Sequence, residues 1–509
     1  MKQILWLRND LRLSDHAGFY QALNNGHPLA VVFIVPKNWF EKDSHEMNRL
    51  GHAKARFLRG SLIDMHRSLE NQTFEFHMYC GDPVEILMDL ANQTDRCRIL
   101  TSAAQAPEEK RWLEQLANLQ EKNPITLDIY ESQTLFQQTQ MASLLQQWPS
   151  TFTHFRKIVE GDATHWKVPK PLLVRRLSLH EFSLTHWSPM SWPSENSATI
   201  RLNHAGGEAA GKQWLQEYIW QHEGLRHYKA TRNQLQGKTA SSHLSHYLAW
   251  GCLSPRQVWH EIEKFESFHE VTEHTYWLKF ELLWREYFHW SMRVHGSALF
   301  QRHGLSSEGN LSAQGLTDIT PNQHENKSPH VHHEQPRHLP QQQPQQQPLL
   351  RQPTHEQQEK LQTNPRWDAW CNAQTGVPMV DAGLKELQTT GWVSNRLRQN
   401  MASYFIHQLQ LDWRLGARWF EQQLADFDVG SNWGNWAYLA GVGHDARPQR
   451  QFNLNKQLGQ YDANIEHIKC WLPELNEASL ADIQQHQDGR QLLSNYPAPI
   501  VTVFSSEFS

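Results

Sequence analysis

The sequence has little cysteine and no long hydrophobic run. Its five cysteines among 509 residues are widely spaced, and no two form a C-x-x-C pair. Their odd number and their spacing argue against a disulfide framework and against a zinc site. The longest apolar run, Leu29–Val35, is far shorter than the roughly 20 residues that a membrane helix needs. The first residues also lack the apolar core and cleavage site of a secretory signal, so we expect a cytoplasmic protein without a membrane span.

Neither sign of charge dominates the chain. There are 48 Lys and Arg against 53 Asp and Glu, which leaves a net charge of −5. This balance is unlike that of a protein coated for non-specific binding to polyanions, so any nucleic-acid contact needs a local basic patch. Hydrophobic residues make up 39% of the chain, which suffices for sizeable cores, and the length predicts more than one domain. Tryptophan is unusually common, with 22 residues against 21 Phe and 12 Tyr.

Residues 1–130 alternate short apolar runs with helical patterns. The runs are Ile4–Leu7, Leu29–Val35, Phe74–Tyr79, Ile99–Leu100 and Thr126–Tyr130. Leu29–Val35 is apolar at every position, which is typical of a parallel strand covered on both faces. The pattern therefore predicts an α/β domain with a doubly wound parallel sheet, in which a ligand would lie at the strand ends.

The spacing of apolar residues changes in the remainder of the chain. Residues 131–200 show no sustained period and contain several prolines, which is typical of a long linker between domains. From about Gly206 the apolar spacing becomes helical, so residues 201–500 predict an all-α domain. Residues 304–364 interrupt it with a segment rich in Gln, Pro and His. This composition predicts a disordered insertion, and its histidines lack the fixed spacing of metal ligands, so no metal site is predicted.

Two stretches of the helical half could bind a ligand. Ser241, Ser242 and Ser245 precede an apolar helical segment, where hydroxyl groups and free backbone N–H groups form an anion cradle or simply cap the helix. Glu281, Trp284 and Arg285 share one helix face with Phe288. They could hold a planar polar ligand, or they could form an aromatic core stripe edged by one ion pair.

Two further polar runs lie inside helical regions. They are Thr390–Asn400 and Asp426–Tyr438, and the second is followed by a glycine-rich segment that ends at Arg447. Buried polar groups need partners, so these runs either line a cavity or lie on the surface.

Taken together and in this order, these motifs resemble the photolyase/cryptochrome family of flavoproteins, and most closely its cryptochrome DASH branch. The resemblance extends over nearly the whole chain. Its motifs are Trp6–Arg12, Tyr228–Asn233, Gly251–Arg256, Phe280–Phe288, Asn432–Tyr438 and Trp471–Leu475.

The resemblance implies an N-terminal antenna domain and a C-terminal domain that binds FAD. By motif match, the cofactor would be held by Tyr228, Ser241, Ser242, Ser245, Arg285, Asn395, Arg398, Asp426, Asp428 and Asn432. Arg398 and Asp426 are expected to form an ion pair beside the flavin, and Asn432 is expected to face the flavin N5. A methenyltetrahydrofolate antenna is a further cofactor of the family, but Thr101–Glu109 contains no clear counterpart of its folate-binding acid.

The implied activity is blue-light repair of cyclobutane pyrimidine dimers, preferentially in single-stranded DNA, by electron transfer from reduced flavin. The catalytic residues would be Glu281, Trp284, Asn432 and Tyr438, and the DNA-binding residues would be Arg232, Glu281, Trp284, Arg396 and Gln457. RNA is a further candidate partner, and we expect a monomer. Two alternatives stay open: a blue-light photoreceptor with a signalling role, and a flavin-free module that binds single strands by stacking.

The resemblance also implies a tryptophan chain that passes electrons to the flavin. Trp436 and Trp413 match two of its members, whereas the third position falls on Lys360, so Trp367 or Trp370 would have to replace it. His243 stands where a Lys or Arg is usual in the phosphate loop. Trp433 and His444 stand where the DASH motif usually has Tyr and Asn.

Overall fold

The computed structural model describes residues 1–72, 74–173, 200–305, 364–444 and 451–503. Most of the predicted insertion, with its histidines and Lys360, lies outside these ranges, as do residues 445–447 of the last DASH motif. Within the described ranges, no helix combines the length and the apolar character needed to cross a bilayer.

The N-terminal part contains a five-stranded sheet in the order β3-β2-β1-β4-β5, and every neighbouring pair is parallel. The strands are β1 Lys2–Leu7, β2 Leu29–Pro36, β3 Phe76–Gly81, β4 Cys97–Ser102 and β5 Ile125–Tyr130. All residues of β2 are buried, as its uniformly apolar sequence predicts. The order reverses between β1 and β4, which makes this a doubly wound sheet, and the predicted fold class of this part is confirmed.

The predicted strand Phe74–Tyr79 begins two residues too early. The backbone N–H of Phe74 donates to the carbonyl of Leu69 at 3.0 Å, so this residue closes the turn after a helix. Pairing with β2 starts only at Phe76.

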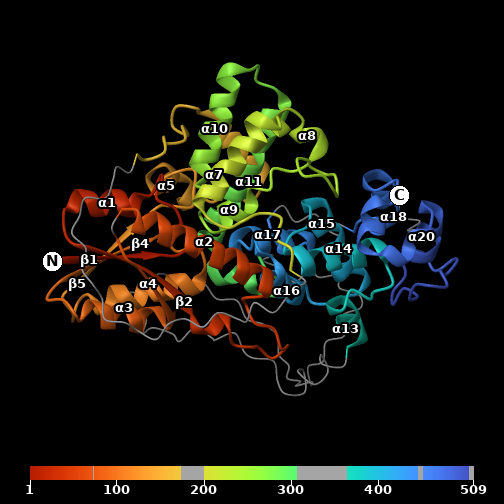
Figure 1. Ribbon diagram of the computed structural model, residues 1–509, viewed down its shortest axis with the longest axis horizontal. Coiled ribbons are helices and arrows are strands. Elements are labelled where there is room, and N and C mark those ends of the chain that lie inside the picture. Colours follow the sequence, from red (N-terminus) through yellow and green to blue (C-terminus); the bar gives the residue numbers. More distant parts are fainter. Residues whose placement is uncertain (73, 174–199, 306–363, 445–450, 504–509) are drawn as a thin grey trace, which may run out of the picture.

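Helices cover both faces of the sheet (Figure 1). They are α1 Ala17–Asn25, α2 His52–Glu70, α3 Pro83–Ala91 and α4 Pro107–Leu119, with the short helix η1 Lys37–Trp39 after β2. Leu5 and Leu7 of β1 pack in one core cluster with α1 and α2. Ile4 and Trp6, which point to the opposite face, pack in another with α3 and α4. The alternation along β1 therefore places apolar side chains in two cores.

The segment expected to be an irregular linker contains two helices, α5 Gln138–Gln146 and α6 Phe152–Gly161. In α6, Phe152, Phe155 and Val159 are buried on one face, but this helical period lasts for fewer than three turns. The carboxylate of Glu286 accepts hydrogen bonds from the backbone N–H groups of Leu135 (2.7 Å) and Phe136 (3.1 Å). The segment predicted as a linker therefore contains regular structure and packs against α11 in its described part.

The described residues from Glu208 onward are helical apart from their connecting loops, as predicted. Their elements are α7 Glu208–Gln216, η2 Glu217–Gln221, η3 Gly224–Arg226, α8 Tyr228–Thr231, α9 Ser245–Ala249, α10 Pro255–Phe268, α11 Glu273–His295, η4 Gly296–Phe300, α13 Pro365–Cys371, α14 Pro378–Thr390, α15 Asn395–Ser403, η5 Tyr404–Gln408, α16 Trp413–Gln423, α17 Val429–Leu439, α18 Leu454–Tyr461, α19 Glu466–Trp471, η6 Pro473–Leu475 and α20 Leu480–Gln487. The long helix α11 starts at a capping box formed by Thr272 and Thr275.

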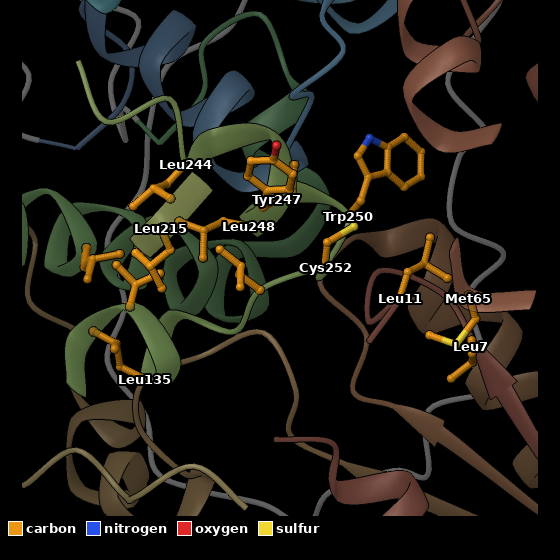
Figure 2. Close-up of a cluster of buried hydrophobic side chains, with 14 of the residues drawn as sticks. Leu7, Leu11, Met65, Leu135, Leu215, Leu244, Tyr247, Leu248, Trp250 and Cys252 are labelled. Atoms are coloured by element: carbon orange, nitrogen blue, oxygen red, sulfur yellow. The ribbon is translucent and has the colours of Figure 1, made fainter. Parts of the chain in front are cut away.

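One core cluster extends from the sheet into the helical part. Figure 2 shows Leu7 and Leu11 beside Met65 on one side, and Leu244, Tyr247 and Leu248 on the other, with Trp250 and Cys252 in between. Gly251 has φ +65°, and a Cβ at this position would lie 2.0 Å from the carbonyl oxygen of Asn9. Only glycine therefore allows the chain after α9 to approach the end of β1 so closely.

Candidate functional site

A cavity of about 400 Å³ opens among α8, α9, α11, α15 and α17. This volume is in the range of about 300–1,000 Å³ that is usual for sites of organic ligands. The predicted site residues that line it are Tyr228, Arg232, Ser241, Ser242, Ser245, Glu281, Trp284, Arg285, Asn395, Arg398, Asp426, Asp428 and Tyr438. The structure thus brings together residues from all four candidate stretches.

A charged pair lies at the wall of this cavity. Arg398 donates from Nη2 to both carboxylate oxygens of Asp426, at 3.1 and 2.8 Å, and from Nε to the carbonyl of Val393 at 3.0 Å. The Asp426 side chain is 1% exposed. Burial alone would raise the pKa of Asp426, but the charge and hydrogen bonds of Arg398 hold that pKa below its usual value. The expected pair is therefore present in the geometry, and Asp426 is charged at neutral pH.

A second buried carboxylate, Asp428, caps α17. Its Oδ1 accepts a hydrogen bond from the backbone N–H of Ser431 at 2.7 Å, and its Oδ2 lies 2.7 Å from Nε2 of His289 and 3.7 Å from Nη2 of Arg285. Burial opposes ionisation, but His289 and Arg285 lower the pKa of Asp428 well below its usual value. His289 was not predicted from the sequence, although it follows Arg285 by one helical turn on the same face as Glu281.

The serine loop and His243 form one end of the cavity. His243 adopts φ +50°, is 7% exposed, and lies with its ring centroid 4.1 Å from that of Trp392. The carbonyl of Ser242 accepts a hydrogen bond from the indole N–H of Trp214 at 2.7 Å. A hydrogen bond from Ser245 helps to lower the pKa of Asp426, so the loop and the charged pair are in contact.

Aromatic rings and one carboxylate line the mouth of the cavity. Trp284 stacks on Phe152 with ring centroids 3.8 Å apart and an interplanar angle of 17°, and it lies 6.3 Å from Tyr438. Glu281 forms an ion pair with Arg232. Burial raises the pKa of Glu281, although Arg232 opposes this shift. Phe152 was not predicted, because it belongs to the segment taken as a linker.

Asn432 lies apart from this mouth. It lines a smaller cavity of about 70 Å³ that shares Asn395, Arg398, Asp426 and Asp428 with the larger one. Its side-chain N–H donates to the carbonyl of Ala417 at 3.0 Å. This bond fixes the orientation of the amide, so that its oxygen is left for another donor.

The predicted electron relays are all buried rings. Trp436 packs over Gly416, where a Cβ would lie 2.3 Å from its ring. Trp413 has its centroid 5.8 Å from that of Trp433, at an angle of 77°. Trp370 and Trp367 instead contact Phe405 at 4.7 and 6.3 Å, and Phe405 lies 5.5 Å from Trp436. The structure therefore places a phenylalanine between Trp436 and either proposed third member.

Arg396 and Gln457 do not line the cavity but belong to the neighbouring helices α15 and α18. Arg396 donates from Nη2 to the Asn233 side-chain oxygen at 3.2 Å. The Gln457 side-chain oxygen is buried without a hydrogen-bond partner among the described residues. Arg396 is thus in contact with the cavity-lining Asn233, and neither predicted DNA-binding residue is inside the site.

The acids of Thr101–Glu109 are engaged within the fold. Glu108 forms a 2.6 Å ion pair with Arg49. Glu109 accepts a hydrogen bond from the backbone N–H of Gln105 at 2.6 Å and lies 3.4 Å from Arg8. A folate antenna at this edge of the sheet stays a prediction.

Comparison with known proteins identifies the family. A family model described as the FAD binding domain of DNA photolyase matches residues 324–507, and one described as DNA photolyase matches residues 3–172. The cryptochrome DASH of Synechocystis sp. is 32% identical over 99% of this chain and 96% of its own length. A cryptochrome DASH of Arabidopsis thaliana, described as chloroplastic/mitochondrial, is 30% identical over 98% of this chain and 79% of its own length.

Solved structures agree. The crystal structure of the Synechocystis sp. PCC6803 cryptochrome matches with a TM-score of 0.80 and 32% identity, covering 98% of this chain and 96% of that one. A class III photolyase from Agrobacterium tumefaciens, at 24% identity and a TM-score of 0.72, covers 98% of this chain and 94% of its own and shares the fold. The chain therefore belongs to the photolyase/cryptochrome family of FAD-binding flavoproteins, and the relatives that it matches over nearly their full length include several cryptochrome DASH proteins.

Proposed function

We propose that this protein repairs cyclobutane pyrimidine dimers under blue light and prefers single-stranded DNA. The observation that carries the proposal is that Glu281, Trp284 and Tyr438 line the same cavity as the Arg398–Asp426 pair. Lesion-binding and flavin-binding residues would then face each other across one space. FAD held by these residues in its reduced form would supply the light-driven electron transfer that splits the dimer ring.

The donor set of the cavity fits FAD. The serine hydroxyl groups and the free N–H groups of the loop before α9 suit a diphosphate. The Arg398–Asp426 pair offers a cation and an acceptor to a polar planar ring, and Asn395 lies on the same wall. In this arrangement the pair tunes the electrostatics around the ring rather than stabilising the fold.

The mouth of the cavity suits an extruded pyrimidine dimer. Phe152 supports one face of Trp284, which leaves this ring positioned to stack on a lesion, with Tyr438 on another side. Because Glu281 binds protons more readily when buried, its carboxyl group can act as a hydrogen-bond donor or acceptor to a base edge. Extruding a dimer costs only a few kcal/mol, and least in a single strand, which supports the single-strand preference.

Repair of a defined oligonucleotide tests the proposal. The reduced holoprotein is mixed with a single-stranded oligonucleotide that contains one thymine dimer, is illuminated with blue light, and the intact thymines are quantified. We expect light-dependent repair that is faster than with the matching duplex. Absence of repair, with FAD bound and fully reduced, would contradict the proposal and favour the photoreceptor alternative.

His243 makes cofactor binding depend on pH. Burial, assisted by the neighbouring His246, lowers the pKa of His243 to about 4, so its imidazole is neutral near pH 7. Its Nδ1 is buried without a hydrogen-bond partner among the described residues. A bound diphosphate favours the protonated ring and raises its pKa, so FAD binding takes up a proton and tightens as the pH falls toward about 4.

Fluorescence titration of the apoprotein with FAD between pH 5 and 8 measures this effect. His243→Lys carries a permanent charge, so we expect tighter binding at pH 8 and a flatter pH profile. His204→Asn is the matched control, because His204 lies beside His243 with ring centroids 5.1 Å apart but does not line the cavity. The same pH dependence in the wild type and in His243→Lys would contradict the role of His243.

A further inference from the structure

A buried lysine connects the N-terminal part of the chain to the wall of the cavity. Lys54 lies in the first turn of α2 and is 3% exposed. Its Nζ donates to the carbonyl of Arg49 at 2.9 Å and to the carbonyl of Glu421, on α16, at 3.3 Å. Lysine is almost never buried to this extent unless it is paired. The position of this ammonium group therefore points to a role in joining α2 to α16, which lies beside it (Figure 1).

The same ammonium group lies over an aromatic ring. Nζ of Lys54 is 4.2 Å from the ring centroid of Phe427, and its two bonds to carbonyl groups leave one of three N–H groups for this ring. Phe427 stands between Asp426 and Asp428, which both line the cavity, whereas Phe427 itself does not. Lys54 therefore contacts the segment that carries both carboxylates from outside the cavity.

The start of this segment is already held by the backbone. The N–H of Ala425 donates to the carbonyl of Gly391 at 2.8 Å, and the carbonyl of Ala425 accepts from the indole N–H of Trp250 at 2.9 Å. A Cβ at Gly51, the residue before α2, would lie 2.2 Å from the carbonyl oxygen of Gln422. The contact with Lys54 extends this attachment from Ala425 to the cofactor wall.

The charge of Lys54 responds to pH near neutrality, unlike the charges around it. Burial lowers the pKa of Lys54 to about 7, while the charge of Glu421 opposes this shift and that of Arg49 adds to it. Arg49 Nε lies 2.7 Å from Glu421, and Arg49 also pairs with Glu108 of α4 at 2.6 Å. Burial alone would raise the pKa of Glu421, but Arg49, Lys54 and Arg418 hold it below its usual value. Both carboxylates raise the pKa of Arg49, so Arg49 and Glu421 keep their charges between pH 6.5 and 9.

We propose that Lys54 is a positioning residue for the flavin, and that its ammonium group, held against Phe427, fixes the segment that carries Asp426 and Asp428. A ring face attracts a cation much more strongly than a neutral amine, so loss of the proton loosens this segment. The protonated form retains the cofactor more tightly, and FAD is released faster as the pH rises above about 7. The inference rests on the proposed function, because it takes Asp426 and Asp428 as flavin-binding residues.

The rate at which the diluted holoprotein releases FAD, followed between pH 6.5 and 9 by the fluorescence of the free cofactor, tests the inference. We expect the wild type to release FAD roughly 2- to 30-fold faster at pH 9 than at pH 6.5, which is the range that a cation–π contact supplies. Lys54→Met should release FAD fast at every pH, whereas Lys54→Arg keeps the charge and should release it slowly at every pH. The effect of His243 is largest toward pH 4, below this range.

Two further variants complete the test. Phe427→Leu keeps an apolar side chain but removes the ring, so it should release FAD fast and without pH dependence, even if Lys54→Met fails to fold with flavin. Lys279→Met is the matched control and should behave like the wild type. The Lys279 side chain is 16% exposed, pairs with Glu266 and lies 5.3 Å from the Trp259 ring, and both of these partners belong to α10.

Several results would overturn the inference. They are a wild-type rate that does not change with pH, wild-type behaviour of Lys54→Met, a wild-type pH dependence in Lys54→Arg or Phe427→Leu, and the same fast release from Lys279→Met as from Lys54→Met. Failure of the proposed cofactor wall is a distinct result, because Arg398→Met protein would then keep its flavin whatever Lys54 does.

Discussion

Arg398→Met protein is expected to purify without flavin and to unfold at a lower temperature than the wild type. The substitution leaves Asp426, whose side chain is 1% exposed, as a buried charge without its main partner. Breaking such a pair costs about 3–5 kcal/mol, and the partial exposure of Arg398, 23%, places the expected loss near the lower end. Flavin absorbance and thermal unfolding followed by circular dichroism measure the two effects.

Two further variants separate cofactor binding from stability. Arg414→Met is the matched control, because Arg414 and Asp412 form a 2.6 Å pair in which each side chain is 34% exposed. Loss of such a pair costs at most about 1 kcal/mol. Arg398→Met combined with Asp426→Leu removes both charges, so it should recover much of the stability but not the flavin. Normal flavin content in Arg398→Met would contradict the assignment of this wall to the cofactor.

Trp284→Ala protein is expected to keep its flavin but to lose most of its affinity for a dimer-containing single strand. Stacking of one base on an aromatic side chain contributes about 1–3 kcal/mol, which corresponds to a loss of roughly 5- to 150-fold. Phe152→Ala removes the ring that supports Trp284 and should produce a smaller loss in the same direction. Fluorescence anisotropy with the lesion oligonucleotide and its undamaged counterpart measures both.

The affinities for lesion-containing and undamaged strands together show whether Trp284 recognises the lesion or contributes to general strand binding. Only affinity for the lesion should fall strongly, because the undamaged strand also uses the predicted DNA-binding residues Arg232 and Arg396. Phe268→Ala serves as a control, since Phe268 is 70% exposed at the end of α10. Equal losses for both strands would show that Trp284 maintains the general binding surface instead of recognising the lesion.

Local pattern predicts the strands of the sheet and the helical class of residues 201–500. A uniformly apolar run such as β2 has one stable environment, the centre of a parallel sheet covered on both faces. Phe74 was assigned to a strand because it is apolar, but its backbone N–H donates to the carbonyl of Leu69 and places it in the turn after α2. Helix α6 escaped prediction because its apolar period is short.

Some site residues could not be predicted because their role depends on contacts with residues far away in the sequence. His289 is polar and stands at helical spacing from Arg285, but its partner Asp428 lies on another helix. Phe152 becomes functional in our proposal only through its stack on Trp284. The third relay was sought by spacing from Trp370, whereas the ring beside Trp413 is Trp433. Motif matching identifies residues at positions where the family has a functional residue. It does not identify contacts made by a residue that differs from the family's usual one, such as Trp433.

The close approach at Gly251 has a consequence for the order of assembly. The residues that follow helix α9 pack against Asn9 at Gly251. There the backbone N–H of Leu11 donates a hydrogen bond to the carbonyl of Trp250 at 3.1 Å. The serine loop is thus anchored to the end of the first strand. During synthesis, the N-terminal part emerges first and offers this anchor to the helices that follow.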